Sequence, residues 1–319
     1  MPYGIEDQTL AEIEAFAVEI AAEAGKILGR HFGRSLKIEY KDKRESDPVT
    51  DADHESQSFL VEGITKRFPE HGILGEEDDE EKQEDTSPAP DFLWVLDPLD
   101  GTKNFLHGLP IYASSIGVLY KGAPVAGAVF TPWPSDTGGV VLHARKGGGA
   151  FAGDEPVAVL DTEPKGNTLV TLPASFGVTH RFRGPLRRTI FDLRVTGSIA
   201  YELVLVARGA THYMVTTRPH LWDIAGGVMI VMEAGGVLMR GARSGGLLDL
   251  FPSIKWQETE TLVPDWQSGV TSIKDLRSWA SPLTLAGPDT ARLVIDNMQA
   301  HLNLRWWVRR KWRSLKSGG

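Results

Sequence analysis

The segment Asp97-Pro98-Leu99-Asp100-Gly101-Thr102, directly after the apolar run 92–96, limits most strictly what this chain can form. The apolar run predicts a buried strand, and Pro98 has no backbone N–H with which to continue the ladder. The turn brings Asp100 back beside Asp97, with the carbonyl of Leu99 between them. Two carboxylates directed at one point repel each other, and a hard cation offsets that cost by direct coordination. The segment therefore predicts a metal site at a strand end.

The residues after this strand end also suit a phosphate. Gly101 lets the backbone approach a ligand closely, and the N–H groups of Gly101, Thr102 and Lys103 lie at the expected start of a helix. Carboxylates beside such N–H groups indicate metal-assisted phosphate chemistry. An ordinary tight turn explains the same residues, because each of them favours turns. The functional interpretation therefore depends on further acidic segments.

Three other segments place acids in unusual contexts: Asp47-Pro-Val-Thr-Asp-Ala-Asp53, Gly75-Glu76-Glu77 and Trp222-Asp223. Each also has a simpler explanation. Glu76 and Glu77 open a ten-residue run with eight acids, and such runs are usually solvated, an interpretation that we adopt from Asp78 onward. Asp223 is expected to cap the helix that follows it. The joint presence of all four segments favours a common site.

The hydrophobic pattern predicts alternating helices and strands. Apolar residues at helical spacing predict a first helix of about 25 residues from near Leu10, with Thr9 and Glu12 as its capping box. Further helices are expected over 53–67, 198–208 and 224–233. Strands are expected over 37–41, 92–96, 111–119, 125–130, 140–142, 168–171, 192–195 and near Tyr213. This alternation predicts a layered α/β architecture.

Composition narrows the possible functions. The 319 residues are 41% hydrophobic and include no Cys, which excludes disulfides, thiolate zinc sites and a cysteine nucleophile. Six basic residues lie in 303–319, so the formal net charge of −8 leaves −14 on the rest of the chain. An acidic body argues against specific nucleic-acid binding and permits a carboxylate–metal site. Because neither a secretory signal nor a stretch of transmembrane length is present, we expect a cytoplasmic protein.

The four segments together resemble the inositol monophosphatase family of metal-dependent phosphatases, which is related to fructose-1,6-bisphosphatases and 3'-phosphoadenosine nucleotidases. Asp97-Pro-Leu-Asp-Gly-Thr-Lys-Asn-Phe105 matches one diagnostic motif of the family, and Trp222-Asp-Ile-Ala-Gly-Gly with Glu233-Ala-Gly-Gly-Val237 matches the other. The resemblance covers about residues 7 to 250 and again 281–288. It implies an α/β fold, a layered αβαβα sandwich of the inositol monophosphatase or sugar phosphatase type.

The resemblance also implies a role for each site residue. Glu76, Asp97 and the carbonyl of Leu99 would hold a first Mg²⁺, and Asp97, Asp100 and Asp223 a second. Glu77 would support these ligands or hold a third, weaker ion. Thr102, hydrogen-bonded to Asp53, would orient the attacking water, so that Asp53, Thr102 and Glu76 are the catalytic residues. The implied substrate contacts are Asp100, Gly101, Thr102, Ile199, Thr216 and Asp223. Oxygen ligands without paired His or Cys favour Mg²⁺ over zinc, and lithium sensitivity follows from the resemblance alone.

The match is weaker around the substrate. Family members that hydrolyse inositol monophosphate have a glutamate where this chain has Thr216. Arg218 and His220 follow it and suit an additional anionic group, although the more common arrangement for a single loop Arg is to point to solvent. Ile199 is bulkier than the small residue often found at its position and would narrow the pocket. The resemblance therefore leaves the substrate open.

We divide the chain into an N-terminal half, 1–155, with most metal ligands, a C-terminal half, 156–300, and a basic amphipathic tail, 301–319. The polar segment 251–281, with scattered Trp, predicts an insertion and not a core element. In the tail, an apolar stripe of Leu304, Val308, Trp312 and Leu315 runs among Arg and Lys. Such a helix suits an anionic membrane surface or a protein partner, which includes this protein's own acidic body or a second subunit.

We therefore expect a Mg²⁺-dependent phosphoric monoester hydrolase, a homodimer, that acts on a small phosphorylated metabolite. Inositol 1-phosphate is the first substrate to consider. The alternatives are histidinol phosphate, fructose 1,6-bisphosphate and a 3'(2'),5'-bisphosphate nucleotide. A non-enzymatic alternative is a binding module that acts on the transcription machinery.

Overall fold

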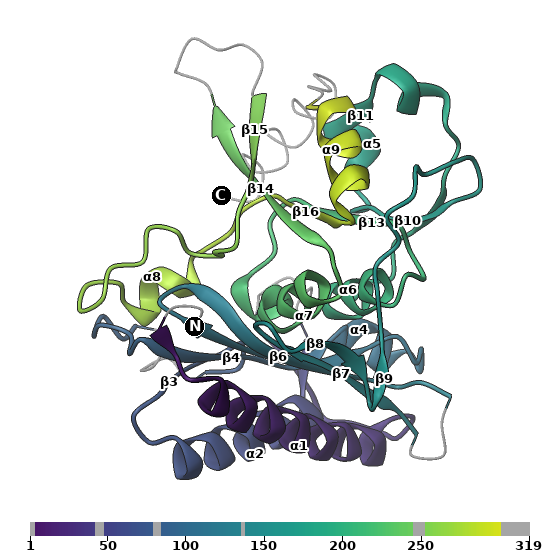
Figure 1. The fold of residues 1–319 in the computed structure, drawn as a ribbon. Helices are drawn as coiled ribbons and strands as arrows, with labels where there is room; N and C mark the ends of the chain where they lie inside the picture. Colours follow the sequence, from purple (N-terminus) through teal and green to yellow (C-terminus); the bar gives the residue numbers. More distant parts are fainter. Residues whose placement is uncertain (1–3, 42–47, 79–83, 135–137, 245–252, 301–319) are drawn as a thin grey trace, which may run out of the picture.

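The computed structural model of the chain describes residues 4–41, 48–78, 84–134, 138–244 and 253–300. Its elements stack in five layers, in the order helices, sheet, helices, sheet, helices (Figure 1). Helices α1 (Asp7–His31) and α2 (Asp51–Arg67) cover the outer face of a seven-stranded sheet. Helices α6 (Ile199–Ala207) and α7 (Leu221–Glu233) separate it from a six-stranded sheet, which α5 (Phe176–Thr179) and α9 (Pro288–Asn297) cover. The expected αβαβα sandwich is confirmed.

The seven-stranded sheet keeps its strands in chain order. They are β3 (Gly72–Gly75), β4 (Phe92–Asp100), β5 (Ala113–Tyr120), β6 (Ala123–Thr131), β7 (Val140–Arg145), β8 (Gly149–Ala152) and β9 (Glu155–Pro156). β3 and β4 are parallel and all other neighbours are antiparallel. Helices cover both faces, so β5 and β6 are buried along nearly their whole length. This explains why their sequences are mostly apolar or small and do not alternate with charged residues.

The middle helix pair packs closely on this sheet because glycines face each other. A Cβ on Gly117 of β5 would lie 2.4 Å from the Cβ of Ala225, and one on Gly127 of β6 would lie 2.3 Å from the carbonyl oxygen of Gly226. Both distances are shorter than any ordinary contact. The helix that carries Asp223 is thereby held against the strands that follow Asp97 and Asp100.

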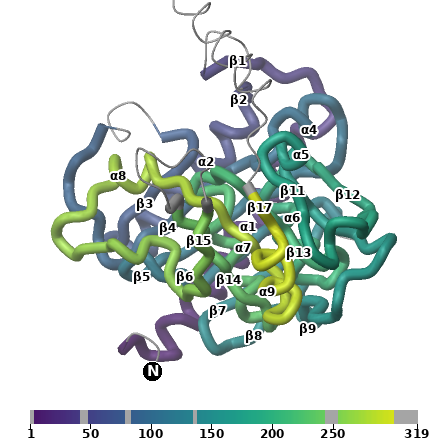
Figure 2. The backbone as a smooth tube through the Cα atoms, turned by 90° about the horizontal axis from the view of Figure 1, so that it is seen from above, coloured from purple at the N-terminus to yellow at the C-terminus, as the bar shows by residue number. Residues whose placement is uncertain are grey.

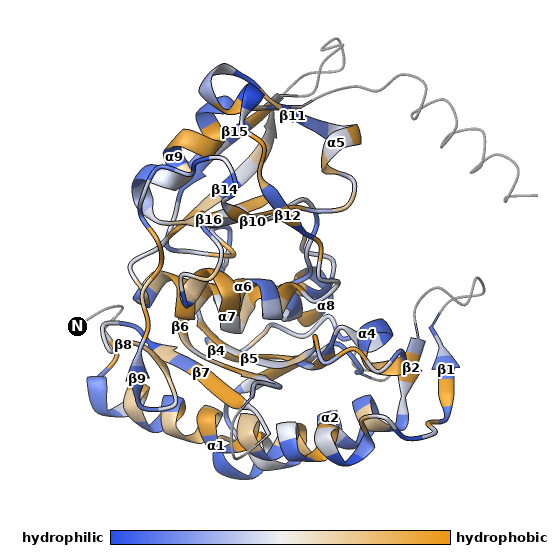
Figure 3. Cartoon of the chain, turned by 90° about the vertical axis from the view of Figure 1, so that its right-hand side faces the viewer, coloured by the Kyte–Doolittle hydropathy of each residue, from blue (hydrophilic) through white to orange (hydrophobic). Residues whose placement is uncertain are grey.

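The six-stranded sheet is mixed. Its spatial order is β12 (Asp192–Arg194), β10 (Leu169–Thr171), β13 (Tyr213–Thr216), β16 (Leu283–Ala286), β14 (Val237–Ser244) and β15 (Ser253–Glu258). The first three are parallel and the rest are antiparallel. Figure 3 shows that α6 and α7, between the sheets, are mostly apolar, whereas the outward faces of α1 and α2 carry hydrophilic residues.

The remaining elements are short. They are the hairpin of β1 (Ile38–Tyr40) and β2 (Pro48–Thr50), helix α4 (Thr102–Leu106), the pair β11 (His180–Phe182) with β17 (Met298–Ala300), a 3-10 helix at Gly184–Arg188, and helix α8 (Ile273–Arg277). Seen from above, α8 lies at the β3 side of the molecule, opposite α5 and β12 (Figure 2). Within the described ranges, no helix combines the length and the apolar character needed to cross a membrane.

Two sequence predictions need correction here. The first helix begins at Asp7 and its N-cap Glu6 makes no side-chain cap, so the Thr9–Glu12 capping box is wrong; a capping box is formed instead by Thr50 and Asp53 at α2. In segment 251–281, Leu262, Val263, Ile273 and Leu276 are buried in the main core. Its polar composition concealed this contribution, and the prediction of a purely peripheral segment is wrong. The apolar stripe of the tail lies outside the described residues.

Candidate active site

Asp97 lies at the predicted place, near the carboxyl end of a buried strand. Its residue is 1% exposed, and its Oδ1 accepts a hydrogen bond from the backbone N–H of Leu99 at 3.1 Å. Pro98 does not end β4 as expected, because the strand continues to Asp100 through an irregularity in its register with β5. Burial, and then the charges of Glu76, Asp100 and Asp223, raise the pKa of Asp97 well above its ordinary value.

The residues at the start of α6 donate hydrogen bonds to Asp100. Its Oδ2 accepts hydrogen bonds from the Ser198 hydroxyl, at 2.8 Å, and from the backbone N–H of Ala200. Burial and the charge of Asp223 raise the pKa of Asp100 well above its ordinary value, against the effect of these two donors. Gly101, which follows, has a φ of 93°, a left-handed conformation that favours glycine.

Asp53 and Thr102 approach each other as the resemblance implies. Asp53 is buried, and its Oδ2 accepts from the N–H and the hydroxyl of Thr50 at 2.8 and 2.6 Å. The Thr102 hydroxyl lies 3.4 Å from Asp53 Oδ1 and 3.1 Å from the carbonyl oxygen of Leu99. Since a hydroxyl donates one proton, the shorter contact to Leu99 is the stronger of the two. Burial raises the pKa of Asp53 to about 6.

Glu76 and Glu77 share a cation that the sequence did not reveal. The Lys41 ammonium lies 2.8 Å from Glu76 Oε1 and 2.5 Å from Glu77 Oε1. Burial alone would lower the pKa of Lys41, but the two carboxylates outweigh it and the pKa is raised. One cation cannot compensate two carboxylates, and burial with the charge of Glu76 raises the pKa of Glu77 to about 7. Lys41 therefore stays charged, and Glu77 holds a proton more readily than an ordinary glutamate does.

Asp223 lies in the first turn of α7. Its Oδ2 accepts a hydrogen bond from the N-cap residue His220 at 2.8 Å, which confirms the predicted capping role. Burial raises the pKa of Asp223 to about 7. The charge of Glu76 contributes to the raised pKa of Asp53, Asp97, Asp100 and Asp223, so the four acidic segments share one region.

Within the described part of the chain, no three His, Asp or Glu side chains are arranged as a ready-made cation site. Protein donors hold three of these acids: the Lys41 ammonium contacts Glu76, the Ser198 hydroxyl donates to Asp100 and the backbone N–H of His220 donates to Asp223. The donor set nevertheless fits a hard divalent ion, because it consists of carboxylate and carbonyl oxygens. Burial first, and then the charges of neighbouring carboxylates, raise the pKa values of Asp97, Asp100 and Asp223. Their roles as ligands stay predictions.

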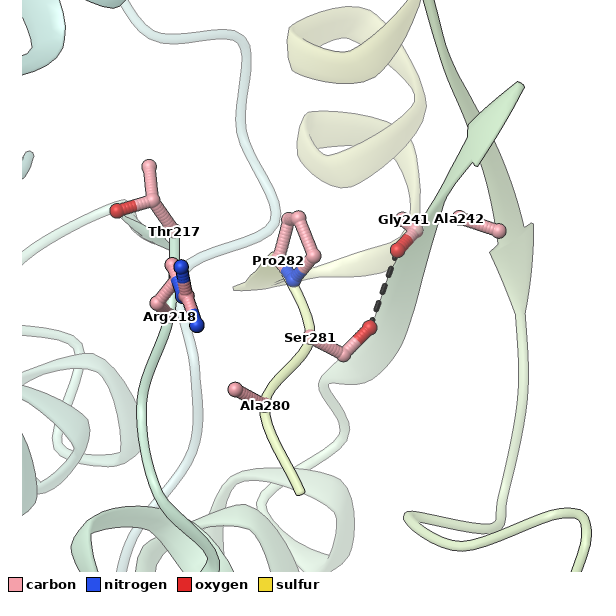
Figure 4. A pocket seen from close by; sticks show the side chains of 7 residues that line it. All are labelled: Thr217, Arg218, Gly241, Ala242, Ala280, Ser281 and Pro282. Atoms are coloured by element: carbon pink, nitrogen blue, oxygen red, sulfur yellow. Dashed lines mark hydrogen bonds between the residues drawn. The ribbon is translucent and has the colours of Figure 1, made fainter. Parts of the chain in front are cut away.

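The structure also locates Ile199 and Thr216, two of the proposed substrate residues. Ile199 is half-buried in the first turn of α6, and Thr216 is buried at the end of β13. The chain after Thr216 lines a cavity of about 370 Å³ with Thr217 and Arg218. In Figure 4 the segment 280–282 forms another wall, where the Ser281 hydroxyl donates to the carbonyl oxygen of Gly241 at 3.0 Å. Sequence reasoning did not identify this cavity.

The layered architecture and an acidic strand end facing a helix start define a class of α/β phosphatases. Comparison with known proteins agrees: the model of the inositol monophosphatase family matches residues 9–271. The fructose-1,6-bisphosphatase/inositol-1-monophosphatase of Thermotoga maritima is 33% identical over 223 residues, 70% of this chain and 82% of that protein. The histidinol-phosphatase of Chlorobaculum parvum is 32% identical over 227 residues, 69% of this chain and 82% of that protein.

Structural similarity gives the same answer. A solved structure of a Thermotoga maritima IMPase matches with a TM-score of 0.64 and 26% identity, over 88% of this chain and 94% of that one. The chain belongs to the inositol monophosphatase family, whose members are phosphatases that hydrolyse phosphate monoesters.

Proposed function

We propose that this chain is a Mg²⁺-dependent phosphomonoesterase whose first substrate is inositol 1-phosphate. The observation that carries the proposal is the group of buried acids Asp97, Asp100 and Asp223, each with a raised pKa. Such a group has too little positive charge around it, and two or three Mg²⁺ ions would supply it. When bound, Mg²⁺ supplies the charge that neutralises the phosphate and the leaving alkoxide.

Each of the proposed site residues would have a separate role. Glu76, Asp97, Asp100, Asp223 and the Leu99 carbonyl would hold the ions, with Glu77 behind them. Thr102 donates its hydroxyl proton within the protein, which leaves an oxygen lone pair to accept a proton from water and so orient it. Asp53 Oδ1 lies 3.4 Å from the same hydroxyl, and Asp53, with a pKa of about 6, is able to take up a proton when the hydroxyl turns from Leu99 toward it. Thr102 is thus an orienting group and not a nucleophile.

A second substrate class has a specific observation in its favour. Arg218 lines the cavity beyond Thr216, where a carboxylate that would bind sugar hydroxyls is missing. A guanidinium suits a second anionic group. This favours fructose 1,6-bisphosphate or a 3'(2'),5'-bisphosphate nucleotide among the alternatives, whereas histidinol phosphate, with its amine, fits less well.

Phosphate release from these four substrates, with and without Mg²⁺, tests the proposal. Mg²⁺-dependent turnover that is fastest with inositol 1-phosphate supports it, and an Arg218→Ala variant separates the two classes. That variant should leave inositol 1-phosphate turnover unchanged and raise KM for a bisphosphate. Absence of Mg²⁺-dependent release from every substrate would favour the binding-module alternative. The homodimer and the cytoplasmic location stay predictions.

A further inference from the structure

Arg277, the last residue of α8, reaches from segment 251–281 into the loop that carries Glu76 and Glu77. Its side chain is 15% exposed. Its Nη2 donates to the carbonyl oxygen of Gly75 at 2.6 Å and to Asp78 Oδ2 at 2.8 Å. Its Nη1 lies 3.5 Å from the carbonyl oxygen of Glu76. One guanidinium therefore contacts the loop on both sides of the Glu76 side chain.

Asp78 extends this contact through the loop. Contrary to the expectation of a solvated acid, its side chain is 1% exposed. Asp78 Oδ2 also accepts from the N–H of Gly75 at 2.9 Å, and Oδ1 accepts from the Gln57 amide at 3.1 Å. Gln57 in turn accepts from the N–H of Glu77 at 3.1 Å. The backbone that presents Glu76 and Glu77 is therefore fixed by three connected side chains.

The Arg277 guanidinium has a second neighbour, Trp222, on α7 in the middle helix layer. It lies 5.2 Å from the ring centroid of Trp222, and the same ring stacks on His220 at 4.5 Å with an interplanar angle of 5°. Trp222 directly precedes Asp223. Arg277 thus contacts both the loop with Glu76 and the helix start with Asp223, which belong to different layers of the fold.

Helix α8 is itself firmly held. Ser272 and Asp275 form its capping box, and Ile273 and Leu276 are buried in the main core. The backbone before it pairs with the chain after the acidic run, at Pro88–Ser272 and at Ala89, whose N–H donates to the carbonyl of Thr271 at 2.8 Å. The position of the guanidinium is therefore set by packing and not by Arg277 alone.

We infer that Arg277 is a positioning residue that holds the Glu76–Glu77 loop against Trp222 and so sets the separation of the metal-binding acids. The inference rests on the proposed function, because it concerns the affinity of the site for Mg²⁺. A residue that orients metal ligands from behind typically contributes a factor of about 10 to 100 in affinity. Lysine carries the same charge but not the planar fork, so it cannot reproduce the contacts to Gly75 and Asp78 together.

The experiment compares Arg277→Gln, Arg277→Lys and the control Lys274→Ala. Lys274 lies on the same helix, is half-exposed and pairs with the exposed Glu84, which is not one of the proposed site residues. Mn²⁺ binding is measured by electron paramagnetic resonance, and the Mg²⁺ concentration for half-maximal turnover is measured beside substrate KM. Both Arg277 variants should weaken Mn²⁺ binding and raise the Mg²⁺ requirement by about tenfold or more, with substrate KM at saturating Mg²⁺ nearly unchanged. The Lys274 variant should behave as the wild type.

The outcomes separate two failures. If the Arg277 variants bind Mn²⁺ as tightly as the wild type, only this inference is overturned and the proposed function stands. An increase in substrate KM without a change in metal affinity overturns it in the same way. If Arg277→Gln does not fold because the buried Asp78 loses its ion pair with the guanidinium, Arg277→Lys decides the question. A wild-type protein that binds no Mn²⁺ and shows no response to Mg²⁺ overturns the proposed function and this inference with it.

Discussion

Asp100 combines a charge and a structural contact that a substitution can separate. Asparagine keeps the size of the side chain and an acceptor for Ser198 and Ala200, but it removes the charge that acts on Asp97 and Asp223. We expect Asp100→Asn to fold normally, to bind Mn²⁺ more weakly and to lower kcat by about a thousandfold. Initial rates of phosphate release and Mn²⁺ titration measure both effects. Asp154→Asn, in an exposed turn, is the charge-matched control. Equal rates for the two variants would show that Asp100 is not part of the site.

A substitution of Thr102 separates an effect on the chemical step from an effect on metal binding. Its hydroxyl contacts Leu99 and Asp53. Thr102→Ala should lower kcat by about a hundredfold while the Mg²⁺ concentration for half-maximal activity stays the same, because the hydroxyl orients water. Thr102→Ser should retain most of the activity. A large increase in the Mg²⁺ requirement of the alanine variant would reassign Thr102 to the metal site.

At the residue scale, sequence reasoning identified acids that belong to motifs and missed the groups that hold them. Asp97, Asp100 and Asp223 were predicted because each stands at an element end with a distinctive neighbour. Lys41 was not, since a lone Lys directly after a short exposed strand carries no local signal. Arg277 lies about 200 residues from its partners in the chain, and only the fold brings such pairs together.

At the element scale, the predicted helices and central strands are found, and the differences lie at their ends. β4 continues through Pro98 because this residue sits at the irregularity between Asp97 and Asp100, where no regular ladder bond is required. The first helix begins at Asp7, with Glu6 as its N-cap, two residues before Thr9. Termini depend on tertiary contacts, whereas the apolar periodicity that identifies an element is local.

The contact between α7 and the first sheet supports a prediction on stability. A Cβ on Gly127 would lie 2.3 Å from the backbone oxygen of Gly226, which cannot move without shifting α7. Gly127→Ala should therefore reduce the free energy of unfolding by about 2 to 3 kcal/mol. The control is Gly29→Ala on exposed α1, where nothing lies within 4 Å of the new Cβ, and it should stabilise by about 0.5 to 1 kcal/mol. Urea unfolding of both variants measures the difference, and equal effects would contradict this packing.

At the scale of the whole molecule, the site joins parts that are remote in sequence. Asp97 and Asp100 come from the first sheet, Glu76 from the end of β3, and Asp223 from the middle helix layer. The division at residues 155 and 156 stays a prediction, but both halves contribute acids to this region. A cation bound here would therefore link two layers, and the raised pKa values of these acids make that link depend on protonation.

The pH dependence of stability follows from this link. Without metal, folding raises the pKa of Asp53 to about 6 and those of Glu77 and Asp223 to about 7. Between the ordinary carboxylate range and these values, the folded state binds more protons than the unfolded state, so stability falls as pH rises toward 8. Mg²⁺ binding requires the charged carboxylates and should stabilise the folded state most at high pH.

We expect the Tm in EDTA to fall from pH 5 to pH 8 and the Tm gained with excess Mg²⁺ to grow over the same range. Thermal unfolding at intervals of pH, with and without Mg²⁺, measures both trends. A Mg²⁺ effect of equal size at pH 5 and pH 8 would mean that the ion binds elsewhere than at these buried acids.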